Sequence, residues 1–316
     1  NRFFGPYAQK VWGIEPSLLN ADDIIRRVTT INLWDVIRKA LRGYLLGKPE
    51  RKGSYPQQPQ QFYYGAKGAG TVMQIIAGQI RKLGGIINID SAVVQMNIKQ
   101  GKIQDVVVQD NKGKNFKRQA DFFVSTMPIT SLIKIIHPLP REEIAREAAP
   151  LQFRALILVD LKVKKERVFN AQWIYFSDKK FIFNRINEFK NISPDFAPNK
   201  KTGLTLEVTC FANDETWNLA DKEIYFKTME DFKKLGLIED SDIEGYTIRR
   251  LEFAYPVPRI DTKDSLNSVL EHLSRIKNLF LAGREARFEY INMDECLDQG
   301  FRLVKEIKSM ANLKEA

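Results

Sequence analysis

Residues 278–300 read NLFLAGREARFEYINMDECLDQG, and this stretch decides the fold. Its first part, Leu279–Ala282, is an apolar run of strand length that ends at Gly283. A glycine at the end of a strand permits a tight turn or the close approach of a ligand to the backbone. From Asn292 onward, apolar residues recur at helical spacing as far as Ile307, and Asn292 can cap that helix. The stretch therefore predicts a strand, a Gly-Arg turn and a capped helix whose N–H groups point at a pocket.

The residues Gly283-Arg284, Phe288, Tyr290 and Asn292-Met293-Asp294 carry a resemblance to a known family. They resemble the C-terminal, flavin-contacting segment of the flavin-containing amine oxidase superfamily, particularly its protoporphyrinogen-oxidase-like and UDP-galactopyranose-mutase-like branches. The resemblance implies that FAD is the cofactor and that these residues contact it. Gly283 and Arg284 would lie along the FAD, with Met293 and Asp294 near its ribityl chain and pyrimidine ring. Arg284, Tyr290 and Asn292 are the candidate catalytic residues.

A simpler reading of the same residues stays open. Gly-Arg can merely end a strand, and Asn292 can merely cap a helix, because turn glycines and caps are common. The reading from residue chemistry agrees with the resemblance, however. A helix N-terminus beside the flavin would stabilise the anion that forms on reduction.

Composition limits the class of protein. The chain has 316 residues, 44% of them hydrophobic and 28% charged, which is typical of a globular protein with one or two domains. The two cysteines, Cys210 and Cys296, form neither a disulfide framework nor a metal-ligand set, so we expect a reducing compartment, the cytoplasm. No apolar window reaches the length of a membrane span, and no signal peptide is visible.

The net charge of +10 indicates a basic surface. A basic surface can attract nucleic acid, anionic membranes or anionic small molecules. No nucleic-acid-binding motif accompanies the charge, so we expect no nucleic-acid partner. Peripheral membrane contact remains compatible with it, and the oligomeric state is left open. A solvated lysine-rich surface is the favoured interpretation.

Residues 1–61 are predicted to form the helical part of a substrate domain. The run from Tyr7 to Gly13 resembles a Y-x-x-K-x-W-G motif of the family, and helices are expected from Asn20–Asp23 and over Leu33–Leu46. No G-x-G-x-x-G follows a strand anywhere in the chain, although the family keeps this dinucleotide fingerprint near its N-terminus. We therefore expect an N-terminal βαβ unit that is not part of the given sequence.

Residues 62–128 are expected to form the middle segment of an FAD-binding domain. Thr71–Gln74 fits a capping box, and apolar residues on one face predict a buried helix that ends at Gly84-Gly85. The residues of that face are Val72, Ile75, Ile76, Ile80 and Leu83. Strands are predicted at Ile86–Ile89, Ala92–Ile98, Ile103–Gln109 and Phe122–Ser125. By resemblance, Val93 pairs with adenine and Thr126 contacts the cofactor.

Residues 129–269 are expected to form the substrate domain, and residues 270–316 the C-terminal segment of the FAD-binding domain. Strands are predicted at Ala155–Val163, Gln172–Phe176, Lys180–Arg185, Leu204–Phe211 and Ile248–Tyr255, with a helix over Glu223–Leu235. By resemblance, the substrate cavity is shaped by Trp173, Tyr175, Arg185 and Tyr255. Ordinary packing of these side chains on a sheet is the alternative.

The predicted fold is therefore α/β, with a discontinuous Rossmann-like FAD domain lacking its N-terminal βαβ unit and a mixed-sheet substrate domain with covering helices. The predicted function is an FAD-dependent oxidoreductase that transfers a hydride from a small-molecule substrate to the flavin. One alternative is a mutase-like isomerase that uses reduced FAD on a sugar nucleotide, and another is a non-catalytic fragment. Asn292 stands where mutase-like proteins often carry a carboxylate. Neither His137 nor His272 has the neighbours of a hydrolase or metal site.

Overall fold

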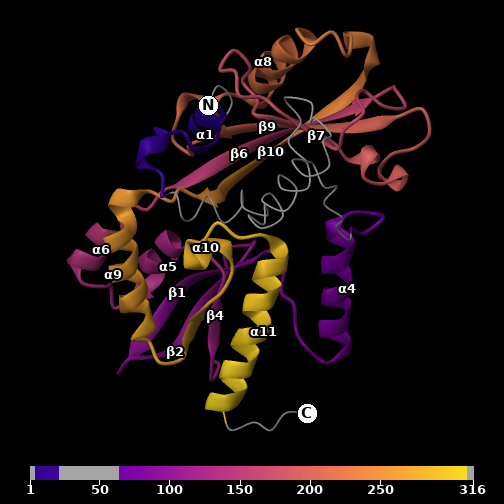
Figure 1. Cartoon of the computed structure of the whole chain (residues 1–316). Coiled ribbons are helices and arrows are strands. Elements are labelled where there is room, and N and C mark those ends of the chain that lie inside the picture. The colour runs from indigo at the N-terminus through magenta and orange to yellow at the C-terminus, as the bar shows by residue number, and fades with distance from the viewer. Residues whose placement is uncertain (1–3, 21–63, 312–316) are drawn as a thin grey trace, which may run out of the picture.

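The computed structural model describes residues 4–20 and 64–311. Figure 1 shows two bodies, one built on a long antiparallel sheet and the other on shorter strands with helices around them. Most of the helical segment predicted at residues 1–61 lies outside the described residues, including the helices expected from Asn20–Asp23 and over Leu33–Leu46. In the described part of the chain, no helix is both long and apolar enough to span a bilayer.

The first body contains a five-stranded antiparallel sheet in the order β10-β6-β9-β8-β7. Its strands are β6 (Phe153–Val163), β7 (Trp173–Tyr175), β8 (Arg185–Glu188), β9 (Thr202–Cys210) and β10 (Ile243–Pro256). Alternate residues of a strand point to opposite faces of the sheet. One face, with Ile157 and Leu206, shares an apolar core with Phe232 of α8 (Asp221–Lys233). Polar residues such as Thr205 and Glu207 alternate with these core residues along β9.

The second body contains a four-stranded sheet in the order β3-β2-β1-β5. Its strands are β1 (Ser91–Lys99), β2 (Lys102–Asp110), β3 (Asn115–Arg118) and β5 (Ile136–His137). Three helices complete its core, α5 (Ile129–Ile135), α6 (Glu142–Ala148) and α9 (Lys263–Ser274). Buried Leu132 of α5 and Leu273 of α9 belong to the same apolar cluster as Met96 of β1.

Two segments that are far apart in the sequence meet in a small parallel sheet. β4 (Phe123–Ser125) pairs with β11 (Leu279–Leu281), so Ser125 lies opposite Leu281 at the carboxyl end of the pair. The chain then continues through Gly283 into α10 (Arg284–Arg287) and α11 (Met293–Met310). Ligands of α/β folds commonly bind at the carboxyl ends of parallel strands, so this edge is where a cofactor site is expected.

The remaining elements of the described chain are α1 (Phe4–Trp12), α4 (Ala69–Lys82), α7 (Glu215–Asn218), η1 (Pro16–Leu18), η2 (Phe189–Asn191), η3 (Pro194–Phe196), η4 (Asp240–Asp242) and η5 (Ile260–Thr262).

Most of the predicted strands are confirmed within a few residues, but two need correction. Residues 86–89 are not a strand, and Ile86 and Ile89 are 84% and 74% exposed. A strand needs a neighbour for its backbone hydrogen bonds, and no described element pairs with this segment. The strand predicted at Lys180–Arg185 instead begins at Arg185, because residues 180–184 form a turn and irregular chain.

The helix predicted after Gly70 is present as α4, but its apolar face is not buried. Val72, Ile75, Ile76, Ile80 and Leu83 are between 37% and 86% exposed. The helix begins at Ala69 after Gly68, so Thr71 lies inside it and does not cap it. The apolar residues Leu297, Phe301 and Val304 of α11 are exposed as well. Amphipathic spacing predicts a helix from local sequence, whereas burial also requires a partner, and none of the described elements covers these faces.

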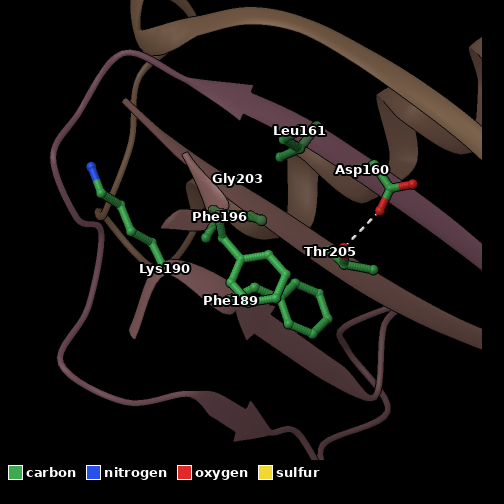
Figure 2. Close-up of a pocket in the computed structure, with 8 residues that line it drawn as sticks. Asp160, Leu161, Phe189, Lys190, Phe196, Gly203 and Thr205 are labelled. Atoms are coloured by element: carbon green, nitrogen blue, oxygen red, sulfur yellow. Dashed lines mark hydrogen bonds between the residues drawn. The ribbon is translucent and has the colours of Figure 1, made fainter. Parts of the chain in front are cut away.

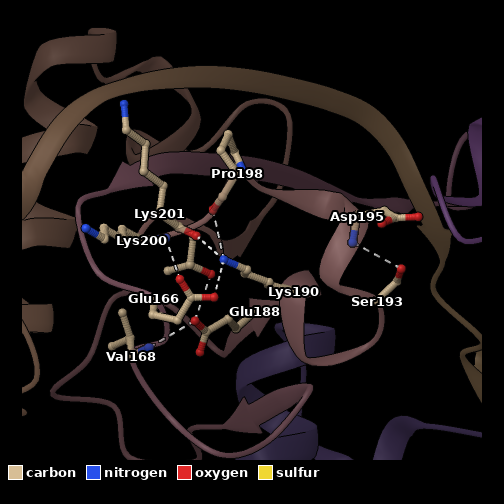
Figure 3. Close-up of polar contacts among 10 residues, drawn as sticks. Glu166, Val168, Glu188, Lys190, Ser193, Asp195, Pro198, Lys200 and Lys201 are labelled. Atoms are coloured by element: carbon tan, nitrogen blue, oxygen red, sulfur yellow. Dashed lines mark hydrogen bonds and ion pairs between the residues drawn. The ribbon is translucent and has the colours of Figure 1, made fainter.

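Two buried charged residues hydrogen-bond to the backbone of the loops beside β8 and β9 (Figure 3). Lys190 is 3% exposed, and its Nζ donates to the carbonyls of Pro198 and Lys201 at 2.9 and 2.7 Å while pairing with Glu166 at 2.6 Å. Glu188 is fully buried and accepts from the backbone N–H groups of Val168 and Phe169 and from the hydroxyl of Thr202. Because every charge has partners, these groups stabilise loops and offer no free donor to a ligand.

Candidate functional site

α1 is fixed to the antiparallel sheet by two cationic side chains. Lys10 donates its ammonium hydrogens to the carbonyls of Phe176, Asp178 and Phe183, at 3.1, 2.9 and 2.7 Å. Arg154 of β6 is 4% exposed and donates Nε–H to the carbonyl of Val11 at 2.9 Å. These contacts hold α1 beside the β7–β8 region, and α1 carries two aromatic residues of the candidate site.

Five aromatic side chains meet where the two bodies join. The rings of Tyr7 and Tyr175 lie 5.3 Å apart between centroids. Trp12 contacts Tyr290 at 4.9 Å and Tyr255 at 6.4 Å, and Tyr255 contacts Tyr290 at 5.5 Å, all edge to face. We call these five residues the aromatic cluster. It joins α1, β7, β10 and the segment that follows α10.

Arg284, which follows β11 of the parallel strand pair, contacts the aromatic cluster. Its Nε and Nη2 donate to the carbonyl of Ile291 at 2.8 and 2.5 Å, and its Nη1 donates to the carbonyl of Ala254 at 3.1 Å. The guanidinium carbon lies 5.3 and 5.4 Å from the ring centroids of Tyr255 and Tyr290, which adds cation–π attraction. In residues 4–20 and 64–311 no carboxylate forms an ion pair with Arg284, and its charge faces the carbonyls of Ile291 and Ala254 and the two tyrosine rings.

Arg185 contributes a second cation from the antiparallel sheet. Its Nη2 donates to Oε1 of buried Glu207 at 2.6 Å, and the same oxygen accepts from Nδ2 of Asn187 at 2.8 Å. Its guanidinium carbon lies 5.9 Å from the ring centroid of Tyr175. Its Nε is buried and has no hydrogen-bond acceptor in the described part of the chain.

Burial and neighbouring charges fix the protonation states of the cluster. Burial raises the pKa of Tyr7 far above its ordinary value, and the nearby Tyr175 acts in the same direction. Burial and the Glu207 carboxylate raise the pKa of Tyr255 to about 12. Although burial alone would lower it, the pKa of Arg185 is raised because Glu207 stabilises the cation. At neutral pH, Tyr7 and Tyr255 are therefore protonated hydrogen-bond donors, and Arg185 is positively charged.

The structure brings together several of the predicted site residues. Arg284, Tyr290, Tyr175, Arg185 and Tyr255 all belong to the aromatic cluster or contact it.

Two predicted site residues lie elsewhere. Trp173 lies on the edge strand β7 and is 39% exposed, without a ring contact to the cluster. Val93 lies in β1, opposite Val108 of β2, and packs partly against the core of the second body.

The predicted flavin-contacting residues lie at the carboxyl end of the parallel strand pair. Gly283 follows β11 with a φ of +86°, and its N–H donates to Oε1 of Gln299 at 2.8 Å. The Ser125 hydroxyl at the end of β4 is buried without a partner among the described residues, and Thr126 beside it is exposed. A buried hydroxyl without a partner is unusual in a native protein, which marks this edge as a place for a ligand.

Asn292, Met293 and Asp294 form the start of α11, as the sequence predicts. Asn292 occupies the N-cap position, and its N–H donates to Glu295 Oε2 at 2.7 Å. Met293 is 48% exposed, and Asp294 lies in the first turn. The first turn of this 18-residue helix therefore presents backbone N–H groups and the positive end of a dipole.

Sequence reasoning missed three members of the site, Tyr7, Trp12 and Glu207. Tyr7 and Trp12 belong to the motif that ends at Gly13, and the motif alone did not indicate which of its residues would face a pocket. Glu207 lies in Leu204–Cys210, where apolar residues alternate with Thr205, Glu207 and Thr209, and it is 6% exposed. This alternation predicts a polar face for Glu207 and gives no signal of its burial or of its partner.

A separate small pocket lies further along the same sheet (Figure 2). Its volume is about 130 Å³, and it is lined by Phe189, Phe196, Thr205 and Asp160 among others. Asp160 already accepts from the Thr205 hydroxyl at 2.6 Å and pairs with Arg249 at 2.7 Å. The ammonium of Lys190 points away from the pocket in Figure 2. The polar side chains of Asp160 and Thr205 in this pocket are therefore already paired. The aromatic cluster is the stronger candidate for the functional site.

The described residues provide no metal centre. In residues 4–20 and 64–311, no three histidine, cysteine, aspartate or glutamate side chains gather as a metal site would require. The chemistry of the cluster is that of phenols, an indole and two guanidinium groups.

The fold is shared with enzymes of known structure. A crystal structure of reduced UDP-galactopyranose mutase matches with a TM-score of 0.74 and 21% identity, over 99% of this chain and 64% of the mutase chain. A protein assigned as a protoporphyrinogen oxidase from Exiguobacterium sp. 255-15 matches with a TM-score of 0.63 and 15% identity, over 85% of this chain and 55% of that chain. An oxidoreductase from Methanosarcina mazei matches with a TM-score of 0.51 and 16% identity, over 76% of this chain and 54% of that chain.

At these identities the matches establish the fold, and they confirm at that level the resemblance stated from the sequence. The chain spans about two-thirds or less of each of these three proteins. No protein-family model and no curated protein matches the sequence.

Proposed function

We propose that this chain is part of an FAD-dependent oxidoreductase in which a small-molecule substrate passes a hydride to the flavin. The observation that carries the proposal is the aromatic cluster with Arg284, which directly follows the carboxyl end of the parallel strand pair. This arrangement supports a substrate site beside the proposed cofactor site, where the two bodies meet. The fold shared with an oxidoreductase and a protoporphyrinogen oxidase supports the same class.

The residues present fit the ring end of such a cofactor. We infer that Gly283, the start of α11 at Asn292–Asp294 and the Ser125 hydroxyl, which has no partner among the described residues, would hold the bound FAD. Gly283 suits a close approach, because a Cβ added there meets no atom of residues 4–20 and 64–311 within 4 Å. When bound, FAD would supply the hydride acceptor.

The side chains of this chain would bind and orient the substrate. Protonated Tyr7 and Tyr255 would donate hydrogen bonds, because their pKa values are raised by burial. Trp12, which is 5% exposed, would help to exclude water from the reacting groups. Arg284 would place a fixed positive charge where negative charge develops, without reorganisation during the reaction.

Cofactor binding is the first test of this proposal. The protein that contains this chain should be purified and its visible absorbance recorded with and without added FAD. A flavin spectrum that bleaches anaerobically with an amine or with protoporphyrinogen, and returns when an electron acceptor is added, would support an oxidoreductase. Failure to bind FAD, in that protein and in the chain of residues 1–316, would instead support a non-catalytic fragment.

A sugar-nucleotide mutase is the second candidate, and a specific observation favours it. Arg185 and Arg284 bring two guanidinium groups to one cluster of tyrosines, and buried Glu207 is the carboxylate that pairs with Arg185 there. Such a site suits the diphosphate of a nucleotide sugar, since guanidinium groups bind phosphate strongly. The mutase match also extends over 99% of this chain.

The two candidates differ in how they use electrons. We expect an oxidoreductase to consume an electron acceptor in proportion to product. A mutase would convert UDP-galactopyranose only after chemical reduction of the protein, and would consume no acceptor. Turnover of UDP-galactopyranose should therefore be measured before and after reduction with dithionite. Product that forms only after reduction would replace the oxidoreductase proposal with the mutase proposal.

A further inference from the structure

Glu207 is a buried acidic residue of the antiparallel sheet, as Glu188 is, but Glu207 accepts from an arginine whereas Glu188 accepts from backbone N–H groups and a hydroxyl. Glu207 lies in the middle of β9, its side chain is 8% exposed, and its backbone carbonyl accepts from the N–H of Asn184 at 2.8 Å. A buried carboxylate is costly unless its hydrogen bonds are satisfied, so its presence in an apolar strand needs a reason. Its Oε1 accepts two hydrogen bonds, one from Arg185 and one from Asn187.

The contact with Arg185 uses only part of the guanidinium. A guanidinium carries five N–H donors, and Glu207 accepts from Nη2 alone. Nε has no acceptor in the described part of the chain, and the side chain as a whole is 29% exposed. Glu207 thus holds one terminal nitrogen of the Arg185 guanidinium, Nη2, and leaves its other N–H donors for another group.

We infer that Glu207 is a positioning residue, which holds Arg185 in the orientation that presents its remaining donors to an anionic ligand bound at the aromatic cluster. The inference rests on the second candidate function proposed above, the sugar-nucleotide mutase, only in that the ligand is an anion. Asn187 supports the arrangement, because its Nδ2 shares Oε1 of Glu207 and keeps that carboxylate oxygen in place. Glu207 itself would not touch the ligand.

The two substitutions Glu207→Gln and Glu207→Ala separate the effect of Glu207 on the orientation of Arg185 from the effect of its negative charge. Both remove the negative charge, which by itself strengthens the binding of an anion. Gln keeps an oxygen that can accept from Arg185, whereas Ala removes it. With UDP as the probe in isothermal titration calorimetry, we expect E207A to bind about tenfold more weakly than the unchanged protein, as for the loss of one charge-assisted contact. We expect E207Q to bind at least as tightly as the unchanged protein.

Repeating the E207A substitution in the R185M variant shows whether Glu207 acts through Arg185. In a double-mutant cycle, E207A added to R185M should cause no further loss of UDP affinity, because the side chain that Glu207 positions is absent. The matched control is Asp160→Asn, which removes a carboxylate from the neighbouring strand β6 that also pairs with an arginine, Arg249, outside the cluster. D160N should leave UDP affinity unchanged.

Three outcomes would overturn the inference. If E207A and E207Q both tighten binding, Glu207 contributes charge alone. If E207A weakens binding equally in the unchanged and R185M backgrounds, its role is in the sheet as a whole. If E207A leaves UDP affinity unchanged, it has no positioning role.

A ligand-free measurement keeps the inference separate from the proposed function. The Nε–H resonance of Arg185, assigned by its loss in R185K, should remain in place in E207Q and shift towards the position of solvent-exposed arginines in E207A. If the protein does not bind UDP, the anionic-ligand proposal fails, and this resonance still decides whether Glu207 orients Arg185. An unchanged resonance in E207A would reject the positioning role.

Discussion

At the scale of single residues, the position of α1 depends on the space that Gly13 leaves for Arg154. Gly13 has a φ of +71°, and a Cβ built there would lie 2.4 Å from Nη1 of Arg154 and 2.8 Å from the Phe211 ring. Arg154 is buried beneath Val11 and stacks on Phe211 at 4.3 Å, so it has little freedom to move. A side chain at position 13 would therefore push α1 away from the sheet.

We predict that Gly13→Ala lowers the free energy of unfolding by about 2–4 kcal/mol, since it adds overpacking to an unfavourable backbone conformation. The matched control is Gly236→Ala, where φ is also positive, at +66°, but nothing lies within 4 Å of the added Cβ. That control should lose only about 1 kcal/mol. Urea unfolding monitored by circular dichroism compares the two, and equal losses would show that contact with Arg154 is unimportant.

Lys10 gives a prediction about pH. Burial lowers its pKa to about 8, while Asp178 and Asp231 oppose that shift. Because an unfolded lysine titrates near pH ~10.4, the unfolded chain binds more protons than the folded chain between pH 8 and that value. Lys10 therefore contributes least to the free energy of unfolding below pH 8. Its contribution rises as the pH increases from 8 towards the pKa of an unfolded lysine.

We expect the stability of the unchanged protein, relative to Lys10→Met, to increase by about 1–2 kcal/mol between pH 8 and pH 10. The three carbonyls that accept from Nζ stabilise the charged form and limit the size of the effect. Urea unfolding of both proteins at pH 7, 8, 9 and 10 gives the difference. Parallel pH profiles would show that Lys10 keeps its ordinary pKa.

At the scale of elements, two helices with similar patterns have different surroundings. α8 buries Phe232 completely in the core of the antiparallel sheet, whereas Phe301 of α11 is 71% exposed. We predict that Phe232→Ala costs about 3–5 kcal/mol of unfolding free energy, while Phe301→Ser changes it by no more than about 0.5 kcal/mol. Thermal and urea unfolding would measure both. A large loss in F301S would mean that the apolar face of α11 is covered in solution.

The same contrast explains the error made for α4. Its sequence has the spacing of an amphipathic helix, and the helix forms, but its apolar residues contact no covering element in the described chain. The segment at Ile86–Ile89 similarly has the composition of a strand, but no strand of the described residues lies beside it. The local sequence pattern was sufficient to predict that α4 is a helix. It was not sufficient to predict whether the apolar face of that helix is buried.

At the scale of the whole molecule, the candidate site depends on contacts between the two bodies. Arg284 follows the parallel strand pair, yet its guanidinium donates to Ala254 and lies against Tyr255 of the antiparallel sheet. If the site binds an anionic ligand, Arg284→Met should weaken UDP binding about tenfold through loss of one charge-assisted contact.

The control for this prediction is Arg284→Lys. It keeps the charge but cannot reproduce the planar fork that reaches the carbonyls of Ile291 and Ala254. An intermediate affinity is expected, and the loss of affinity in R284M should be smaller at high salt because exposed charges are screened. Calorimetry at two salt concentrations measures both effects. UDP affinity in R284M equal to that of the unchanged protein would assign Arg284 to fold stability alone.

Local sequence was enough for the elements whose pattern allows a single type. β6, β9 and α8 were predicted within a few residues, because partial apolar alternation predicts a strand and helical spacing predicts a helix. The turn at Gly283 and the cap at Asn292 follow from backbone conformation and capping chemistry, which depend on neighbours in sequence. The fold-level resemblance was also readable there, since the Gly-Arg turn and the residues after it form one short stretch.

Only the tertiary structure decided which residues form the site. Tyr7, Tyr175, Tyr255 and Tyr290 lie in four separate segments, and their meeting depends on how α1, the antiparallel sheet and the parallel strand pair are arranged. The same is true of Glu207, whose charge is tolerated only because Arg185 and Asn187 lie beside it on the adjacent strand. Burial and pairing are properties of neighbours in space, and periodicity along the chain does not specify those neighbours.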